Sequence, residues 1–377
     1  MPRLLRSSQS SPVDHLLLVY FGILLVVGLI MLTSASSVLG YDRFGDAYFF
    51  VKRQILFGLL PGLVAFFCFV RLPFDWLKKA GLALFGISCI FLVLVFVPGI
   101  GSDLNTFAHS WIVIGGFSFQ PIEMLKLGYV FFVALYLSRR GQVMENFQQG
   151  FLPALVMTGL PLVLVVLQPD IGGVAILFCI LYGMFWLAQT RLIHMALLAA
   201  VAVGGFLLLI LLAPHSAKRF TTFLHPELDP QGIGYHINQA YLAIGSGGLW
   251  GQGLGQSRQK FQYLPEVHAD SIFAILAEET GFVFTCAFIV LLILITRRGF
   301  LLARSLPDDF SRLVMSGILI WFLIQSFFNI MAMVGLMPIT GVPLPFVSHG
   351  GTALVLNLAA IGVLLNLSRR ATINSKL

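Results

Sequence analysis

The stretch HLLLVYFGILLVVGLIMLTS, residues 15–34, contains no Asp, Glu, Lys or Arg and is almost entirely apolar. About 20 such residues are needed for a helix to cross the hydrocarbon core of a bilayer. The whole chain shares this character, with 58% hydrophobic residues, 10% charged residues and a mean hydropathy of +0.93. Soluble domains carry about 25% charged residues. The composition therefore predicts a polytopic, all-α membrane protein.

Ten apolar runs of spanning length occur along the 377 residues. The expected spans are residues 15–35, 54–72, 76–98, 121–138, 151–167, 171–190, 192–213, 271–296, 313–336 and 350–368. One long polar insertion, residues 214–270, separates the seventh span from the eighth. We expect residues 1–377 to form a single integral membrane domain.

The distribution of basic residues predicts the orientation, because Lys and Arg concentrate on the cytoplasmic side of a membrane. With the N-terminus inside, 15 of the 23 Lys and Arg lie on the cytoplasmic side, seven lie outside, and Lys126 lies within a span. We therefore expect both termini in the cytoplasm and the 214–270 insertion on the outer side. This asymmetry explains the net charge of +7 without a nucleic-acid partner.

Glu123 and Lys126 lie within an expected span, in FQPIEMLKLG. A charged side chain there costs about 2.5–3.5 kcal/mol and usually serves a function. Their i, i+3 spacing places them on one helix face, where they can pair. Glu123 also lies in the first turn after Pro121, where the helix dipole favours an anion. The residues fit either a neutralised structural pair or a charged lining of an outward cavity.

A second group of ionisable residues lies at the outer surface, in YLPEVHADSIFAILAEETG, residues 263–281. Glu266, His268 and Asp270 precede the eighth span, which carries Glu278 and Glu279. At about 100° per residue, Glu278 and Glu279 do not share a helical stripe with Asp270. We expect these two glutamates to face neighbouring helices beneath the outer surface.

Two further outer segments draw attention. Asp170, in the tight turn LQPDIGG, fits a turn residue or a helix cap. The segment MVGLMPITGVPLPFVSHGG, residues 333–351, contains three prolines and four glycines and cannot be helical throughout. At membrane depth such a segment must pack against protein or line a cavity. It is a candidate wall of a substrate groove.

Nucleotide and zinc sites are not predicted. The Gly-rich segment GSGGLWGQGLGQSRQK lacks the order of glycines and lysine that makes a P-loop. The histidines lack the spacing of a zinc site.

Four segments together resemble the SEDS family, which comprises FtsW, RodA and SpoVE. They occur in family order and span nearly the whole chain: HSWIVIGGFSFQPIEMLK (109–126), LQPDIGG (167–173), the stretch from KRFTTFLHPELDP to AILAEETG (218–281), and NIMAMVGLMPITGVPLPFVSHGGTALVLN (329–357). The GQGLGQSRQK motif is more similar to the division-type FtsW and SpoVE form than to the RodA form.

The resemblance implies a peptidoglycan glycosyltransferase. Such an enzyme polymerises lipid II, a disaccharide-pentapeptide on undecaprenyl pyrophosphate, at the outer face of the bacterial cytoplasmic membrane during cell division or cell-wall synthesis. The resemblance also implies a class B penicillin-binding protein, a transpeptidase, as partner, and the Asp270 of PEVHAD as the essential acid. A lipid II flippase and a scaffold that recruits the transpeptidase are the alternatives. A transporter usually has repeated halves, and no repeat is evident.

The expected chemistry requires a base for the acceptor sugar hydroxyl, and we assign it to Asp270. Partial burial should raise its pKa. The leaving pyrophosphate needs positive charge, for which Arg219 and Lys260 are candidates. A divalent cation, Mg or Mn, bridging acid and pyrophosphate is compatible with this chemistry. The other expected substrate-binding residues are Glu123, Lys126, Asp170, Glu266, His268, Glu278 and Ser348.

Seven positions depart from the SEDS pattern, although the acids and Lys126 are retained. Where the family has Arg, Ser, Gln, Thr, Phe, Leu and Tyr, this chain has Ser110, Ile122, His236, Ala269, Ser271, Thr280 and His349. These departures are compatible with a specialised or low-activity relative.

Overall fold

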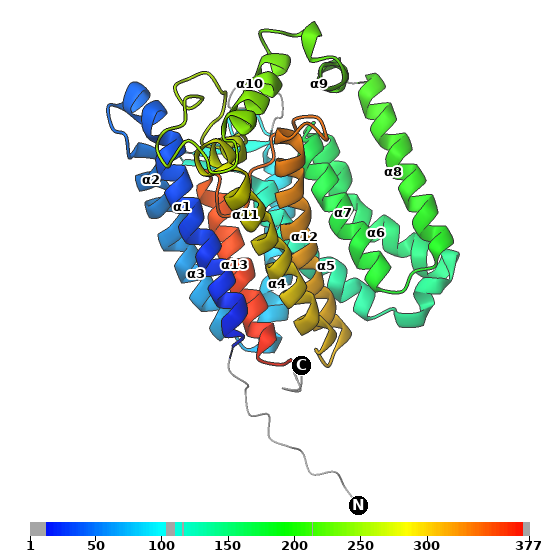
Figure 1. Cartoon of the computed structure of the whole chain (residues 1–377). Helices are drawn as coiled ribbons and strands as arrows, with labels where there is room; N and C mark the ends of the chain where they lie inside the picture. The colour runs from blue at the N-terminus through cyan, green and yellow to red at the C-terminus, as the bar shows by residue number, and fades with distance from the viewer. Residues whose placement is uncertain (1–12, 103–109, 115–116, 213, 372–377) are drawn as a thin grey trace, which may run out of the picture.

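The computed structural model describes residues 13–102, 110–114, 117–212 and 214–371, which form a helical bundle (Figure 1). Its α-helices are α1 (His15–Phe44), α2 (Phe49–Gln54), α3 (Leu60–Arg71), α4 (Phe74–Leu94), α5 (Pro121–Ser138), α6 (Leu152–Val166), α7 (Ile171–Leu187), α8 (Leu192–Leu212), α9 (Pro214–Leu224), α10 (Ile233–Ser246), α11 (Ile272–Arg304), α12 (Asp309–Met333) and α13 (Gly351–Ser368). Short 3-10 or π turns lie at Ile55–Leu59, Gly141–Glu145, Phe147–Phe151 and Pro226–Leu228.

Eight helical segments of the described chain are long and apolar enough to cross a membrane. They correspond to predicted spans one to five and eight to ten. The other two predicted spans are the shorter apolar helices Ile171–Leu187 and Leu192–Leu207; residue 213, the last of the seventh predicted span, lies outside the described residues. The prediction of an all-α polytopic protein is therefore confirmed.

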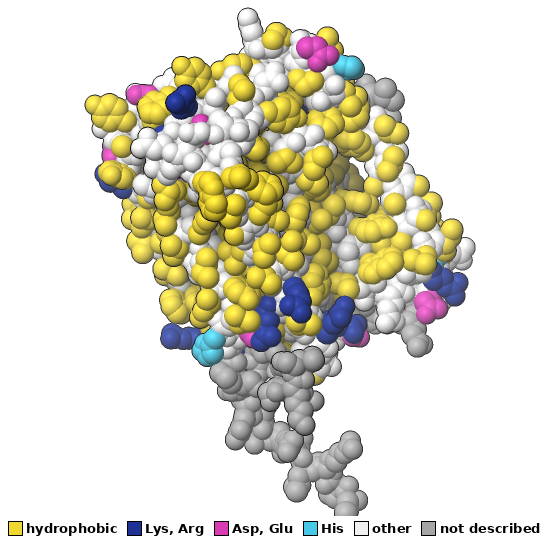
Figure 2. Space-filling model, in the orientation of Figure 1, with side chains coloured by type: hydrophobic (Ala, Val, Ile, Leu, Met, Phe, Trp, Pro, Cys, Tyr) yellow, Lys and Arg dark blue, Asp and Glu magenta, His cyan; other side chains and the backbone are white. Residues whose placement is uncertain are grey.

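The two ends of the bundle differ in the way that the charge distribution predicts. α1 begins and α13 ends at one end, and α10 lies at the other (Figure 1). A broad band of hydrophobic side chains covers the helices between these ends, and Lys and Arg gather where α1 begins (Figure 2). We refer to the end that carries α10 as the outer end.

α5, α12 and α13 form the centre of the bundle, because between 72% and 78% of their most apolar stretches is buried inside the protein. In the span that contains α3 and in α4 the corresponding share is only 17% and 22%. Those helices expose apolar surface, as expected for lipid-facing positions. The central helices are also the ones that lead to the polar groups described below.

Three features were not predicted. α1 has 30 residues and continues to Phe44, where Gly45, with φ of 69°, ends it; at 1.5 Å per residue it exceeds the hydrocarbon core. α11 begins at residue 272, one residue after the expected start, runs to Arg304 and is broken at Gly281, with φ of 76°. A three-stranded antiparallel sheet, β1 (Gly101–Ser102), β2 (Trp111–Ile114) and β3 (Phe117–Phe119), lies between α4 and α5.

Candidate active site

Asp270 lies in a tight turn immediately before α11. Glu266 adopts a left-handed backbone conformation, with φ of 49°. This conformation directs its carbonyl toward the end of the turn, where it accepts hydrogen bonds from the N–H of Ala269 at 2.9 Å and of Ser271 at 3.2 Å. The turn therefore has a fixed shape, and Asp270 stands at the outer end of the bundle.

The same turn is held from its other side by α12 and by the Pro- and Gly-rich segment 334–350. Three consecutive carbonyls, those of residues 268–270, accept hydrogen bonds from outside the turn. Their donors are the N–H of His349 at 2.8 Å, Oγ of Ser348 at 2.6 Å and Nδ2 of Asn329 at 2.8 Å. Ser348, predicted to bind substrate, thus contacts the main chain beside Asp270. Asn329 was missed, although a buried amide in an apolar helix was a usable signal.

Replacing Asn329 with Leu should loosen this turn. Asn329 donates to the carbonyls of both Asp270 and Val342, and leaving buried carbonyls without a donor costs about 1–3 kcal/mol. We expect a lower unfolding temperature in detergent together with a lower turnover per folded molecule. The matched control is Asn366→Leu, because Asn366 donates to three carbonyls, including that of Phe69, at the other end of the bundle. The control should lose similar stability and keep its turnover; equal turnover losses would contradict a local effect.

Arg219 lies near two acids, Asp170 and Asp270. Asp170 caps α7 by accepting a hydrogen bond from the N–H of Gly173 at 2.8 Å. Arg219, on α9, is near enough to both acids for its charge to lower the pKa of each. Among the described residues Arg219 makes no direct ion pair. Its guanidinium is therefore available to a negatively charged ligand.

Segment 334–350 completes this side of the site. A Cβ added to Gly341 would lie 3.5 Å from Oδ2 of Asp270, and one added to Gly172 would lie 2.9 Å from the carbonyl oxygen of Thr340. The beginning of α7, the segment and the Asp270 turn are therefore in close contact. The candidate groove wall predicted from the prolines and glycines does adjoin the predicted base.

Burial dominates the electrostatics of these acids. It raises the pKa of Asp270 to about 7; the negative charge of Glu266 raises it as well, and Arg219 opposes the rise. Burial also raises the pKa of Asp170, against the Gly173 hydrogen bond and the charge of Arg219. Asp270 nevertheless keeps part of its surface exposed. A partly accessible carboxyl with a pKa near 7 suits proton transfer at neutral pH.

Glu123 and Lys126 form the predicted pair, with Nζ of Lys126 2.7 Å from Oε1 of Glu123. Both side chains are almost fully buried on α5. Lys126 also donates to Oε1 of Gln325 at 2.7 Å, and the same oxygen accepts from Nε1 of Trp321 at 2.7 Å. The charges of the pair influence the pKa of Asp170, so the pair adjoins the outer site. Gln325 was missed by sequence reasoning.

His268 packs at the edge of the same turn. Its ring lies 4.4 Å from that of Phe50 and 5.7 Å from that of His349. Burial lowers the pKa of His268, although the charge of Glu266 raises it, which favours a neutral ring at pH 7. Its Nδ1 atom is buried and has no hydrogen-bond partner in the described part of the chain.

Lys260 and Glu278, both predicted to bind substrate, lie in a different cluster. Nζ of Lys260 is 3.1 Å from Oε1 of Glu279, and both side chains are buried. Glu278 accepts hydrogen bonds from Oγ of Ser257 and from the N–H of Arg258. Both glutamates were expected to face neighbouring helices. Glu279 does accept a hydrogen bond from Ser34 of α1, but Glu278 faces the Gly-rich segment instead. The Lys260–Glu279 pair and the hydrogen bonds of Glu278 anchor the Gly-rich segment to α11. The structure therefore does not bring Lys260 into the group of residues around Asp270.

The Gly-rich segment crosses α11 where that helix is broken. The N–H of Phe282 donates to the carbonyl of Gly248 at 2.9 Å, and the N–H of Gly253 donates to the carbonyl of Glu279 at 3.0 Å. A Cβ on Gly251 would lie 2.2 Å from that same carbonyl oxygen, and one on Gly281 would lie 2.2 Å from the nitrogen of Gly251. Only glycine fits at these two positions.

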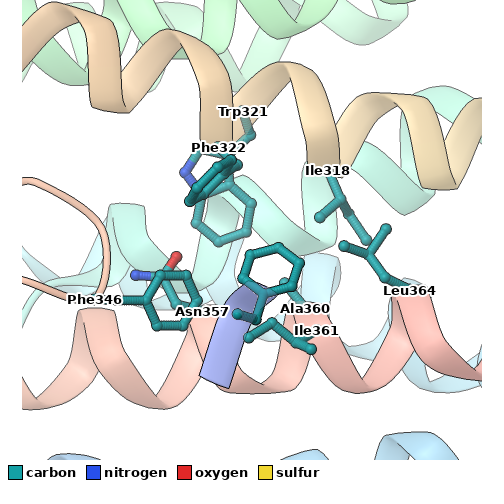
Figure 3. A pocket seen from close by; sticks show the side chains of 9 residues that line it. Ile318, Trp321, Phe322, Phe346, Asn357, Ala360, Ile361 and Leu364 are labelled. Carbon is teal, nitrogen blue, oxygen red and sulfur yellow. The ribbon is translucent and has the colours of Figure 1, made fainter. Parts of the chain in front are cut away.

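A small cavity elsewhere in the bundle carries less weight. A cavity of about 10 Å³ among α1, α12 and α13 is lined by aromatic and aliphatic side chains and Asn357 (Figure 3); it has room for about one water molecule and none for a sugar. Within the described ranges no three His, Cys, Asp or Glu side chains gather to hold a metal ion. A cation that bridges one carboxylate and a pyrophosphate, as the sequence allows, needs no such cluster.

Known proteins resemble this chain along its length. A family model described as "Cell cycle protein", FTSW_RODA_SPOVE, matches residues 14–373. "Stage V sporulation protein E" of Bacillus subtilis (strain 168) is 41% identical over 364 residues, 96% of this chain and 98% of that protein. "Probable peptidoglycan glycosyltransferase FtsW" of Geobacter sp. (strain M18) is 35% identical over 357 residues, 95% and 97% of the two chains. A chain of a peptidoglycan synthase complex that coordinates polymerization and crosslinking is 27% identical, covers 95% and 98% of the two chains and superposes with a TM-score of 0.75.

Proposed function

The chain belongs to the FtsW, RodA and SpoVE family of cell cycle proteins, and on that premise we propose that it polymerises lipid II. It is a multi-span membrane protein and a peptidoglycan glycosyltransferase, the activity that its FtsW relatives carry in their names. The similar solved chain comes from a peptidoglycan synthase complex, which supports a class B penicillin-binding protein as partner. The relatives of division and sporulation type support a place at the division site of the bacterial cytoplasmic membrane.

One observation carries the catalytic assignment: a partly exposed carboxyl with a pKa of about 7 stands in a rigid turn at the outer end of the bundle. Asp270 takes the proton from the acceptor sugar hydroxyl as that oxygen attacks the anomeric carbon of the donor. A new glycosidic bond forms, and the bond from the anomeric carbon to the lipid pyrophosphate breaks. The pyrophosphate leaves with the bonding electrons.

Arg219 is the cation best placed for the leaving group. It lies near both Asp170 and Asp270, and burial lowers its pKa while the two carboxylates raise it. A fixed positive charge at the developing pyrophosphate stabilises the transition state. Glu266 and His268 of the turn, together with Ser348, which contacts it, form the proposed substrate-facing side of the site. Glu123, Lys126 and Asp170 lie next to this side.

The direct test is polymerisation of lipid II by the purified protein with a class B penicillin-binding protein in liposomes. Glycan strands should form whenever lipid II is present. Movement of lipid II across the bilayer without strand formation would indicate the flippase, and an inactive protein that only binds the transpeptidase would indicate the scaffold.

The pH dependence of this reaction should report the surroundings of Asp270. A base must be deprotonated to act, so kcat/KM should rise with pH through about 7, the pKa of Asp270. Arg219 lowers that pKa and Glu266 raises it. We therefore expect the acid limb of the profile to move to higher pH in Arg219→Gln and to lower pH in Glu266→Gln. Initial rates measured between about pH 5 and pH 9 check both signs; shifts in the same direction would contradict the assignment of the base.

A further inference from the structure

His236 contacts the residue next to Asp270. It lies on α10, at the outer end of the bundle (Figure 1). Its Nε2 atom is 2.6 Å from Oγ of Ser271, and that hydroxyl lies 2.7 Å from the carbonyl oxygen of Pro265. Ser271 is fully buried. The contact therefore joins α10 to both ends of the turn that carries Asp270.

The two short distances fix the direction of each hydrogen bond. A serine hydroxyl has one proton to donate, and a main-chain carbonyl can only accept. The proton of Ser271 therefore goes to Pro265, and the oxygen of Ser271 accepts a hydrogen bond from Nε2–H of His236. Burial lowers the pKa of His236 to about 4, so the ring is neutral at pH 7. The arrangement selects the tautomer with its proton on Nε2.

We propose that His236 is a positioning residue that holds the Asp270 turn in its reactive geometry through Ser271, a role that rests on the proposed function. Asn329 and Ser348 fix the same turn from the other side. His236 and Ser271 are both positions at which this chain departs from the SEDS pattern of Gln and Phe. A phenylalanine has no hydroxyl to accept this hydrogen bond, so the contact belongs to this chain rather than to the pattern.

Loss of the contact should change both the rate and its pH dependence. Displacement of a catalytic group by about 1 Å can cost on the order of 100-fold in rate. A looser turn also admits water to Asp270, and burial is the main reason that the pKa of Asp270 is raised. Better hydration lowers that pKa. The acid limb of the rate profile should therefore move to lower pH, which a simple loss of folded protein would not cause.

The first experiment measures lipid II polymerisation, with the partner transpeptidase, by His236→Ala, Ser271→Ala and the double variant. Each single variant should lose kcat by about 10- to 100-fold and show the shifted acid limb. His236→Ala removes only the contact with Ser271, whereas Ser271→Ala also removes the hydrogen bond to Pro265. The double variant should therefore be no worse than Ser271→Ala alone. His236→Gln, whose amide can still donate, should recover most of the rate. A wild-type kcat in His236→Ala would overturn the proposal. A loss of kcat in the double variant equal to the product of the two single losses would also overturn it.

The matched control is His225→Ala. His225 belongs to the same insertion, but its side chain is exposed, and the only polar partner of its ring among the described residues is Glu227, at 3.1 Å. Its loss should leave the rate and the acid limb unchanged. A similar effect in this control would show that any histidine of the insertion matters, which would also overturn the proposal.

A second measurement needs no activity. Side-chain nitrogen-15 spectra of histidine-labelled protein should show His236 protonated on Nε2 in the wild type and a mixture of tautomers in Ser271→Ala. If the wild type fails to polymerise lipid II but shows this tautomer, the proposed function is wrong and the contact stands. If the wild type polymerises but His236 carries its proton on Nδ1, the function stands and the positioning proposal fails.

Discussion

Asp270→Asn should leave the protein folded in the membrane and lower lipid II polymerisation by at least about 10²–10⁴-fold, the usual contribution of a general base. An amide of the same shape cannot take the sugar proton. The turn should survive, because the external hydrogen bond at this residue is made to its main-chain carbonyl, from Asn329. The measurement is the initial rate of strand formation with saturating transpeptidase, with folding followed by thermal unfolding in detergent.

The raised pKa of Asp270 also predicts how this substitution changes the stability of the protein relative to the wild type. Burial raises the pKa of Asp270 to about 7, above about 3.9 for an exposed Asp. The folded protein therefore binds the proton more tightly than the unfolded chain, and the stability contributed by the protonated acid is lost as the pH rises through about 7. At alkaline pH the Asn variant should unfold at the same or a higher temperature than the wild type.

Asp46→Asn provides the control, because Asp46 is a carboxylate at the outer end that pairs with exposed Lys52 at 2.6 Å. We expect wild-type rates from it. Wild-type rates from Asp270→Asn would remove Asp270 as the base, and the polymerase assignment would then need another acid.

Lys126→Met is expected to be the most destabilising of the substitutions considered. It removes the cation from a buried pair and leaves Glu123 charged and unpaired on α5, which costs about 3–5 kcal/mol. Adding Glu123→Gln should restore much of the lost stability by removing that uncompensated charge. The matched control, Arg312→Met, breaks an exposed i, i+3 pair with Asp309 and should cost less than about 1 kcal/mol. Thermal unfolding in detergent gives the order of the three variants.

The double variant also separates the two interpretations of this pair. The charges of Glu123 and Lys126 influence the pKa of Asp170 in the outer site. We therefore expect the double variant to regain stability without regaining turnover. Normal turnover per folded molecule would make the pair purely structural.

Local patterns in the sequence predicted the bundle well, and long-range contacts explain what they missed. The fourth predicted span matches α5 at both ends, because Pro121 marks its first residue and the apolar run stops at Ser138. The i, i+3 spacing likewise predicted the Glu123–Lys126 pair. No local pattern could reveal that Lys126 also meets Gln325, which lies 199 positions away.

The candidate site likewise combines residues that the sequence identified with contacts that only the structure reveals. The acids of PEVHAD were identified from the sequence, and Arg219 does come near Asp270. Lys260 does not join them, because Glu279 satisfies its charge in a buried pair. The hydrogen bonds that give the turn its shape come from α10, α12 and segment 334–350. Tertiary packing decides which donor meets which carbonyl. The spacing of residues in the sequence therefore could not predict these hydrogen bonds.

The crossing of Gly251 and Gly281 links two stretches that leave the ribosome at different times. The carbonyl of Gly248 and the N–H of Gly253 find their partners on α11, so these two groups stay hydrated until that later helix has entered the bilayer. α11 in turn needs the earlier loop in place to satisfy the groups exposed by its break. During biosynthesis, neither stretch can complete its main-chain hydrogen bonds before the other is in place. The outer end of the bundle therefore folds late and in one step.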